Sequence, residues 1–130
     1  MHQIDIADDT FVRAPVDVVA AATADRARWR RWWPDLRLQV AQDRGLKGTR
    51  FEVSGPLTGT MEIWLEPVRH GVVLHYFLRA DLSDQPAVRR TAQTERERER
   101  RRRSFRHHMW ALKDELEAAP QAAQPTPVLS

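Results

Sequence analysis

The sequence holds one tyrosine, Tyr76, in the segment GVVLHYFLRADL, and it is the first candidate for chemistry. Tyr76 alternates with Leu74 and Leu78, which places it on the apolar face of a predicted strand. A buried phenol needs a hydrogen-bond partner. That partner could be a ligand carbonyl, which Tyr76 would orient or protonate, or it could be the backbone or a water molecule. Tyr76 is therefore the candidate catalytic residue, with a purely structural hydroxyl as the alternative.

A run of arginine and glutamate, ERERERRRRSFR over residues 95–106, carries the second candidate chemistry. Its seven arginines and three glutamates give a local charge of +4, which exceeds the net +3 of the whole chain. Guanidinium groups bind carboxylates and phosphates bidentately. Arg98, Arg101 and Arg102 continue the apolar stripe of a predicted helix, so they are candidate contacts for an anionic headgroup. The alternative is a solvated helix end held by internal Glu–Arg pairs.

The same run could bind nucleic acid through phosphate groups. Its glutamates neutralise part of the charge, and its one aromatic residue, Phe105, is needed for the core, so we expect no nucleic-acid partner. The chain has no cysteine, and no histidine pair has helical ligand spacing, so we expect neither a metal nor a cofactor. It also lacks a glycine-rich phosphate loop and a nucleophile elbow.

Length and composition describe one domain. The 130 residues are 42% hydrophobic and 30% charged, which is typical of a globular protein. We expect a single domain over residues 1–118 and a disordered tail, rich in proline and alanine, over 119–130. The N-terminus does not resemble a signal peptide, and no window reaches about 18 apolar residues. A cytoplasmic location without a membrane span is therefore expected, and the absence of cysteine fits it.

Hydrophobic periodicity predicts the elements that position these residues. A strand is expected over 2–13, where the acidic pair Asp8-Asp9 would be the place for a break. Pro15 suits the first position of a helix and Asp25 suits an N-cap, which predicts two short helices. The expected elements are strand 2–13, helices 15–23 and 26–32, strands 35–43, 48–55, 58–68 and 71–82, and helix 94–117.

The last two strands predict their own register. If the turn at 69–71 places Val68 opposite Gly71, then Ile63 faces Tyr76 on a fully apolar face. The opposite face is mixed, with Trp64 opposite His75. A slip by one residue would mix the two faces, so the pattern fixes the pairing of the strands.

The stretch RWRRWWPDL, residues 28–36, contains three tryptophans beside three arginines. It could form a surface that binds a membrane, a sugar or a nucleic acid. At helical spacing, however, Trp29 and Trp32 or Trp33 share a face with the apolar residues before them. Pro34 then ends the helix. We expect the tryptophans to fix two short helices against the sheet and to form a wall at one end of a pocket.

Several motifs together resemble the START-like (SRPBCC) superfamily, and in particular small bacterial polyketide cyclase/dehydrase-type proteins. They are Arg13-Ala14-Pro15, the helix with Val16 and Val19, Asp25, the tryptophan-containing turn before Pro34, GTMEIWLEPV and ALKDELE. The resemblance implies the α+β helix-grip fold, in which a curved antiparallel sheet wraps around a long C-terminal helix. Members bind lipids, polyketides, quinones or hormones, and a minority catalyse cyclisation or hydrolysis. Six or seven strands are usual there, whereas this sequence predicts five.

The function that the resemblance implies is binding of a small hydrophobic molecule, such as a lipid, a fatty-acyl or a polyketide-like compound, between sheet and helix. The residues expected to line the site are Trp33, Phe51, Val53, Met61, Ile63, Leu65, Leu74, Tyr76, Leu78, Phe105, Met109 and Leu112, with Leu36, Leu38 and Val40 beside them. The same residues could instead simply fill the core. Two further alternatives are a cyclase acting on a poly-ketone chain, and a protein- or RNA-interaction module that uses the arginine-rich helix. Either a monomer or a dimer fits the sequence.

Overall fold

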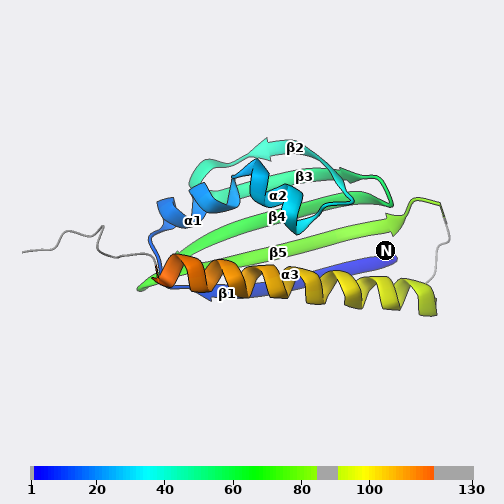
Figure 1. Cartoon of the computed structure of the whole chain (residues 1–130). Coiled ribbons are helices and arrows are strands. Elements are labelled where there is room, and N and C mark those ends of the chain that lie inside the picture. Colours follow the sequence, from blue (N-terminus) through cyan, green and yellow to red (C-terminus); the bar gives the residue numbers. More distant parts are fainter. Residues whose placement is uncertain (1, 85–90, 119–130) are drawn as a thin grey trace, which may run out of the picture.

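The computed structural model describes residues 2–84 and 91–118, which form an antiparallel sheet with three helices on one face (Figure 1). The sheet has five strands in the order β1-β5-β4-β3-β2. The elements are β1 (Ile4–Val12), α1 (Val16–Thr23), α2 (Arg26–Trp32), β2 (Arg37–Asp43), the short 3-10 helix η1 (Gly45–Lys47), β3 (Gly48–Ser54), β4 (Leu57–Val68), β5 (Gly71–Leu82) and α3 (Ala92–Ala118). The α+β class and the five strands predicted from the sequence are confirmed.

The three helices together cover the inner face of the sheet. α3 contacts β1, α1 contacts β4 and β5, and α2 contacts α3. The apolar stripe of α3 is buried as predicted, at Phe105, Met109, Leu112 and Leu116. Among the described residues, no helix is apolar over enough of its length to cross a bilayer.

The β4–β5 hairpin adopts the register that the alternating pattern predicted. Val68 lies opposite Gly71, Ile63 opposite Tyr76, and Trp64 opposite His75. Ile63 and Tyr76 are buried on the inner face, and Trp64 stacks on His75 on the outer face, with ring centroids 4.3 Å apart. One buried face was therefore enough to fix the pairing.

Two local predictions were wrong. β1 continues through Asp8 and Asp9, which pair with Tyr76 and His75 of β5. Asp8 does not break the strand because Arg106 of α3 donates to its carboxylate at 2.8 Å. Pro15 has an extended ψ of 150° and acts as the N-cap, so α1 begins one residue later than expected. Asp25 does cap α2, by accepting from the Ala27 amide at 2.9 Å. The tail 119–130, predicted to be disordered, lies outside the described residues.

Gly48 begins β3 in a backbone conformation that other residues avoid. Its φ is 111°, and a Cβ built there would lie 2.0 Å from the Ile63 carbonyl oxygen. Gly45, three residues earlier, has φ of 62° and nothing within 4 Å of such a Cβ. Gly48 therefore has both a conformational and a steric reason to be glycine, whereas Gly45 has only the first.

We predict that Gly48→Ala lowers the free energy of unfolding by about 3 kcal/mol, because strain and a backbone clash act together. The matched control, Gly45→Ala, should cost about 1 kcal/mol, the price of a left-handed conformation alone. Urea unfolding of both variants measures the difference. Equal losses would show that the β3–β4 approach does not constrain Gly48.

Candidate functional site

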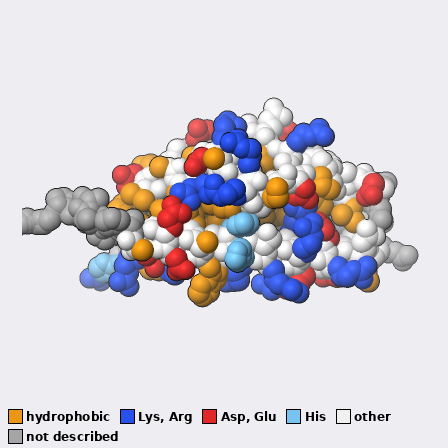
Figure 2. Space-filling model, in the orientation of Figure 1, with side chains coloured by type: hydrophobic (Ala, Val, Ile, Leu, Met, Phe, Trp, Pro, Cys, Tyr) orange, Lys and Arg blue, Asp and Glu red, His pale blue; other side chains and the backbone are white. Residues whose placement is uncertain are grey.

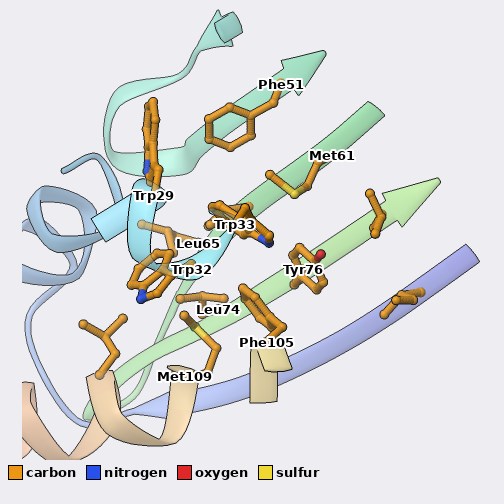
Figure 3. Close-up of a cluster of buried hydrophobic side chains, with 14 of the residues drawn as sticks. Trp29, Trp32, Trp33, Phe51, Met61, Leu65, Leu74, Tyr76, Phe105 and Met109 are labelled. Carbon is orange, nitrogen blue, oxygen red and sulfur yellow. The ribbon is translucent and has the colours of Figure 1, made fainter. Parts of the chain in front are cut away.

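A buried aromatic cluster lies between the sheet and α3, with Trp33 at its centre (Figure 3). The Trp33 ring lies nearly parallel to Phe105 of α3, with centroids 5.9 Å apart, and to Tyr76 of β5, at 6.1 Å. Phe51 of β3 lies 6.2 Å away, and Trp32 meets Trp33 edge-on at 5.6 Å. Trp33 thus occupies a slot lined by aromatic side chains of β3, β5 and α3.

The chain reaches this slot because α2 stops abruptly. Pro34 disfavours a helical conformation at the residue before it. Trp33 accordingly has φ of −134° and ψ of 67°, while its amide still donates to the Trp29 carbonyl at 2.8 Å. Trp29 is itself anchored, since its indole nitrogen donates to the Thr23 carbonyl at 2.7 Å. The side chain of Trp33 is therefore directed into the core from an irregular segment rather than from a helix or strand.

Tyr76 is 1% exposed and stacks on Phe105 with a centroid distance of 3.7 Å. Burial raises the pKa of its phenol, an effect that the hydrogen bond from the Trp33 side chain and the nearby charge of Arg101 oppose only partly. The hydroxyl therefore stays neutral. Because an indole N–H only donates, Tyr76 accepts the hydrogen bond from Trp33. The indole of Trp33 is thus a partner of the phenol oxygen that the sequence analysis did not consider.

Arg101 holds the segment that follows Trp33. Its side chain is 6% exposed, and it donates bidentately to Asp35, with nitrogen–oxygen distances of 2.9 and 2.5 Å, and to Glu97 at 2.8 Å. Burial alone would raise the pKa of Asp35, but the hydrogen bonds and charge of Arg101 outweigh it and the pKa lies below its usual value. The pKa of Glu97 is lowered in the same way, against burial, by Arg100 and Arg101.

Residues 33–35 therefore make two adjacent contacts with the rest of the molecule, and we call them the 33–35 segment. Trp33 fills the aromatic slot, and Asp35 neutralises Arg101. A small cavity of about 80 Å³ lies where the two contacts meet. Its walls come from Trp32, Trp33, Pro34, Arg100, Arg101, Ser104 and Phe105.

The structure brings together the side chains that were expected to line a ligand site. All twelve are at most 3% exposed and belong to one core cluster with inward-facing side chains: Trp33, Phe51, Val53, Met61, Ile63, Leu65, Leu74, Tyr76, Leu78, Phe105, Met109 and Leu112. Leu36 is also buried, while Leu38 and Val40 are only partly buried near the β2 edge. In this conformation these residues pack on one another, so their contact with a ligand stays a prediction.

The three arginines proposed as headgroup contacts lie in different surroundings. Arg98 donates to the Asp5 carbonyl of β1 at 3.1 Å, and Arg102 pairs with Glu99 at 2.8 Å. Arg101 is the member of the three that lines the small cavity. Arg101 can therefore bind an anionic ligand only if the ligand replaces Asp35 or Glu97.

The tryptophans of α2 are core residues, as the sequence favoured. Trp29, Trp32 and Trp33 are 7%, 5% and 3% exposed. Arg28 of α2 reaches α3 and donates to Glu115 at 3.0 and 2.7 Å. α2 is therefore tied to α3 at both of its ends, by Arg28–Glu115 and by the 33–35 segment.

A second hollow, of about 450 Å³, lies on the opposite face of the sheet, and the sequence reasoning missed it. Its outward-facing walls are Arg50, Glu52, Thr60, Glu62, Phe77 and Arg79. Ala41 also borders it, at the point where the β2–β3 pairing shifts register. Alternation along the strands pointed to these side chains, but the shape depends on that irregularity.

Comparisons with known proteins identify the fold. No protein-family model matches the sequence, and no curated protein matches it at significant similarity. The Aha1 dimer from Colwellia psychrerythraea has a TM-score of 0.61 at 14% identity, over 88% of this chain and 97% of that one. DynU16, a protein in the dynemicin biosynthetic locus, has a TM-score of 0.59 at 15% identity, over 88% of this chain and 47% of that one. StfQ, a di-domain ARO/CYC from the steffimycin biosynthetic pathway, has a TM-score of 0.53 at 18% identity, over 88% of this chain and 51% of that one. The chain thus has the helix-grip fold, as its sequence motifs implied.

We predict that Asp35→Asn lowers the free energy of unfolding by about 2 kcal/mol at pH 7, because it weakens two hydrogen bonds to a buried charge. The folded-state pKa of Asp35 lies below its unfolded value, so this stabilisation is present above about pH 4 and is lost as the pH falls through the folded pKa. Urea unfolding at a series of pH values should therefore show wild type and variant converging in acid. The exposed Asp9→Asn is the control, and a difference that persists unchanged at low pH would contradict the role of the Asp35 charge.

Proposed function

We propose that this protein binds a small hydrophobic molecule between the sheet and α3, and that the ligand takes the place of the 33–35 segment. One observation carries the proposal. Two residues that flank Pro34 place an aromatic ring beside the stacked Tyr76–Phe105 pair and a carboxylate on a buried arginine, next to a small cavity. Both side chains belong to an irregular segment, so one movement of that segment would free both positions.

The shape of the slot favours a planar ligand. Phe105 and Tyr76 stack on each other and lie within 13° and 21° of the plane of the Trp33 ring, so a flat ring in its place would lie offset beside the same pair. A ligand carbonyl could then accept a hydrogen bond from the Tyr76 hydroxyl, which would have lost its bond to Trp33. A polyketide-like or aromatic compound meets these conditions better than a fatty-acyl chain does.

The charge of the site favours an anionic group on the ligand. Asp35 has a side-chain exposure of 43%, so its carboxylate can return to water when it leaves Arg101. A carboxylate or enolate of the ligand would then pair with the guanidinium, while Glu97 keeps its own contact. Without such a group, release of Asp35 would leave part of the Arg101 charge unpaired in a buried place.

The affinity of the ligand depends on the cost of displacing Trp33. Removing a buried tryptophan side chain from a core costs about 3–5 kcal/mol. The ligand must bury a comparable apolar area to offset that cost, and its observed affinity is reduced by the rarity of the open form. Ligands at least as large as indole are therefore expected. DynU16 and StfQ, both named for biosynthesis, support a biosynthetic intermediate as the ligand class.

We predict that Trp33→Ala binds naphthoate at least tenfold more tightly than wild type, because the slot no longer has to be vacated. Isothermal titration calorimetry measures the affinity, and a cooperative thermal transition confirms that the variant is folded. Trp33→Leu, which keeps part of the packing, serves if the alanine variant unfolds. Trp110→Ala, at an exposed tryptophan, is the control. Naphthalenemethanol, which lacks the carboxylate, should bind more weakly than naphthoate. Equal affinity of wild type and both Trp33 variants for naphthoate would refute the proposal.

Catalysis of the polyketide cyclase kind is a second candidate, favoured by the neutral phenol of Tyr76 in the wall of the slot. In an aldol closure, an enolate carbon of a poly-ketone chain attacks a carbonyl carbon, and the carbonyl oxygen gains a proton. Tyr76 would donate a hydrogen bond to that oxygen as negative charge develops on it.

We predict that Tyr76→Phe abolishes turnover of a poly-ketone substrate while changing its affinity by less than threefold. Unchanged turnover would leave Tyr76 a binding residue only.

A further inference from the structure

Trp110 of α3 is a large apolar side chain that the fold leaves in solvent, at 55% exposure. It lies on the helix face opposite the buried stripe of Phe105, Met109 and Leu112. Six exposed residues form that outer face, and we call them the outer stripe: Arg96, Arg100, Arg103, His107, Trp110 and Asp114. Packing against the sheet explains the inner face of α3 but gives no reason for a tryptophan on the outer one.

The outer stripe has the spacing of a helix–helix seam. Its members follow one another at alternating intervals of four and three residues, which is the a/d pattern of a heptad repeat. Any one face of an α-helix repeats at these intervals, so the spacing only defines the face, and the exposed tryptophan on it is the feature that calls for a partner. A second helix that lies along α3 would contact all six residues.

Charge along the outer stripe changes sign from one end to the other. Arg96, Arg100 and Arg103 lie in the first half, and Asp114 lies in the second. Arg100 pairs with Glu97 at 2.7 Å and Arg103 with Glu99 at 3.2 Å, and each glutamate is shared with a second arginine of α3. Arg96 and Asp114 remain, and within the described residues neither has an ion-pair partner. They are opposite charges at opposite ends of one face.

We propose that the outer stripe is a dimer interface, on which α3 of a second copy lies antiparallel around a two-fold axis near residue 105. Antiparallel helices pair a positions with d positions. In this register Asp114 meets Arg96 of the second copy, Trp110 meets Arg100, and His107 meets Arg103. The two-fold axis repeats each contact, so the pairing gives two ion pairs and two cation–π contacts.

Other occupants fit the outer stripe less well. A membrane would gain only one apolar side chain, and nucleic acid would meet glutamates between the arginines. The space-filling view shows positive and negative side chains interspersed over the face that carries α3, without a broad basic patch (Figure 2). A second copy matches this pattern because it presents the same charges in reverse order. Two helices alone bury less area than most stable dimers, so dissociation in the micromolar range is expected.

Sedimentation velocity over a concentration series tests the interface on the full chain. We expect a monomer–dimer equilibrium that Trp110→Ala weakens at least tenfold. Arg96→Asp and Asp114→Arg should each weaken the dimer, and the double variant should restore it, because only the antiparallel register joins these two positions. Arg96, Trp110 and Asp114 are all exposed, so the variants should remain folded, which circular dichroism checks. A chain that stays monomeric at all concentrations, or a double variant without recovery, would overturn the proposal.

A disulfide cross-link tests the same register independently. The chain has no cysteine, so a single introduced thiol can pair only with its copy. Ser104 flanks the outer stripe and lies close to the two-fold axis, so Ser104→Cys should form a covalent dimer under mild oxidation. Gln39→Cys, exposed on β2, is the matched control and should not. Equal cross-linking of the two variants would overturn the proposal. The proposal would also be overturned if the protein remained monomeric in solution and bound phosphatidylserine vesicles through Trp110.

Discussion

The contact between Arg101 and Asp35 determines how the two halves of this molecule meet. It joins the middle of α3 to the turn between α2 and β2, across 66 residues of sequence. A guanidinium that is 6% exposed must be paired, and its partner has to come from that turn because Glu97 alone leaves hydrogen-bond donors unsatisfied. Trp33 is two residues away from Asp35, so the same contact sets the position of the aromatic cluster.

In the conformation described here, the space between sheet and helix is filled by side chains of the chain itself, above all by Trp33. Such a core is stable without a ligand, because its apolar surface is already buried and its buried polar groups at Tyr76 and Arg101 have partners. Under the proposed function, ligand binding would be an exchange of one set of contacts for another rather than the filling of an empty space. Such an exchange would let a protein of this size combine a packed core with a binding function.

Sequence patterns predicted the features that depend on neighbours in the chain or on one buried face. The β4–β5 register and the burial of the apolar stripe of α3 are of this kind. Contacts between distant, irregular segments were not predictable. Asp35 follows a proline in a turn, and no periodicity connects it to Arg101. Asp8 resembled a strand break because its partner, Arg106, is 98 residues away in the sequence. The hollow on the outer face of the sheet likewise depends on a bulge in β2, which the alternation of apolar and polar residues does not predict.

The most direct measurement of the central claim is a fluorine NMR titration of protein labelled with fluorotryptophan. The Trp33 resonance is assigned from the spectrum of Trp33→Phe, and naphthoate is added to the wild-type protein. If the ligand takes the place of the 33–35 segment, the Trp33 resonance moves toward the position of a solvent-exposed tryptophan while Trp64, on the outer face, keeps its shift. Saturation of the protein with naphthoate while the Trp33 resonance stays unchanged would contradict the account.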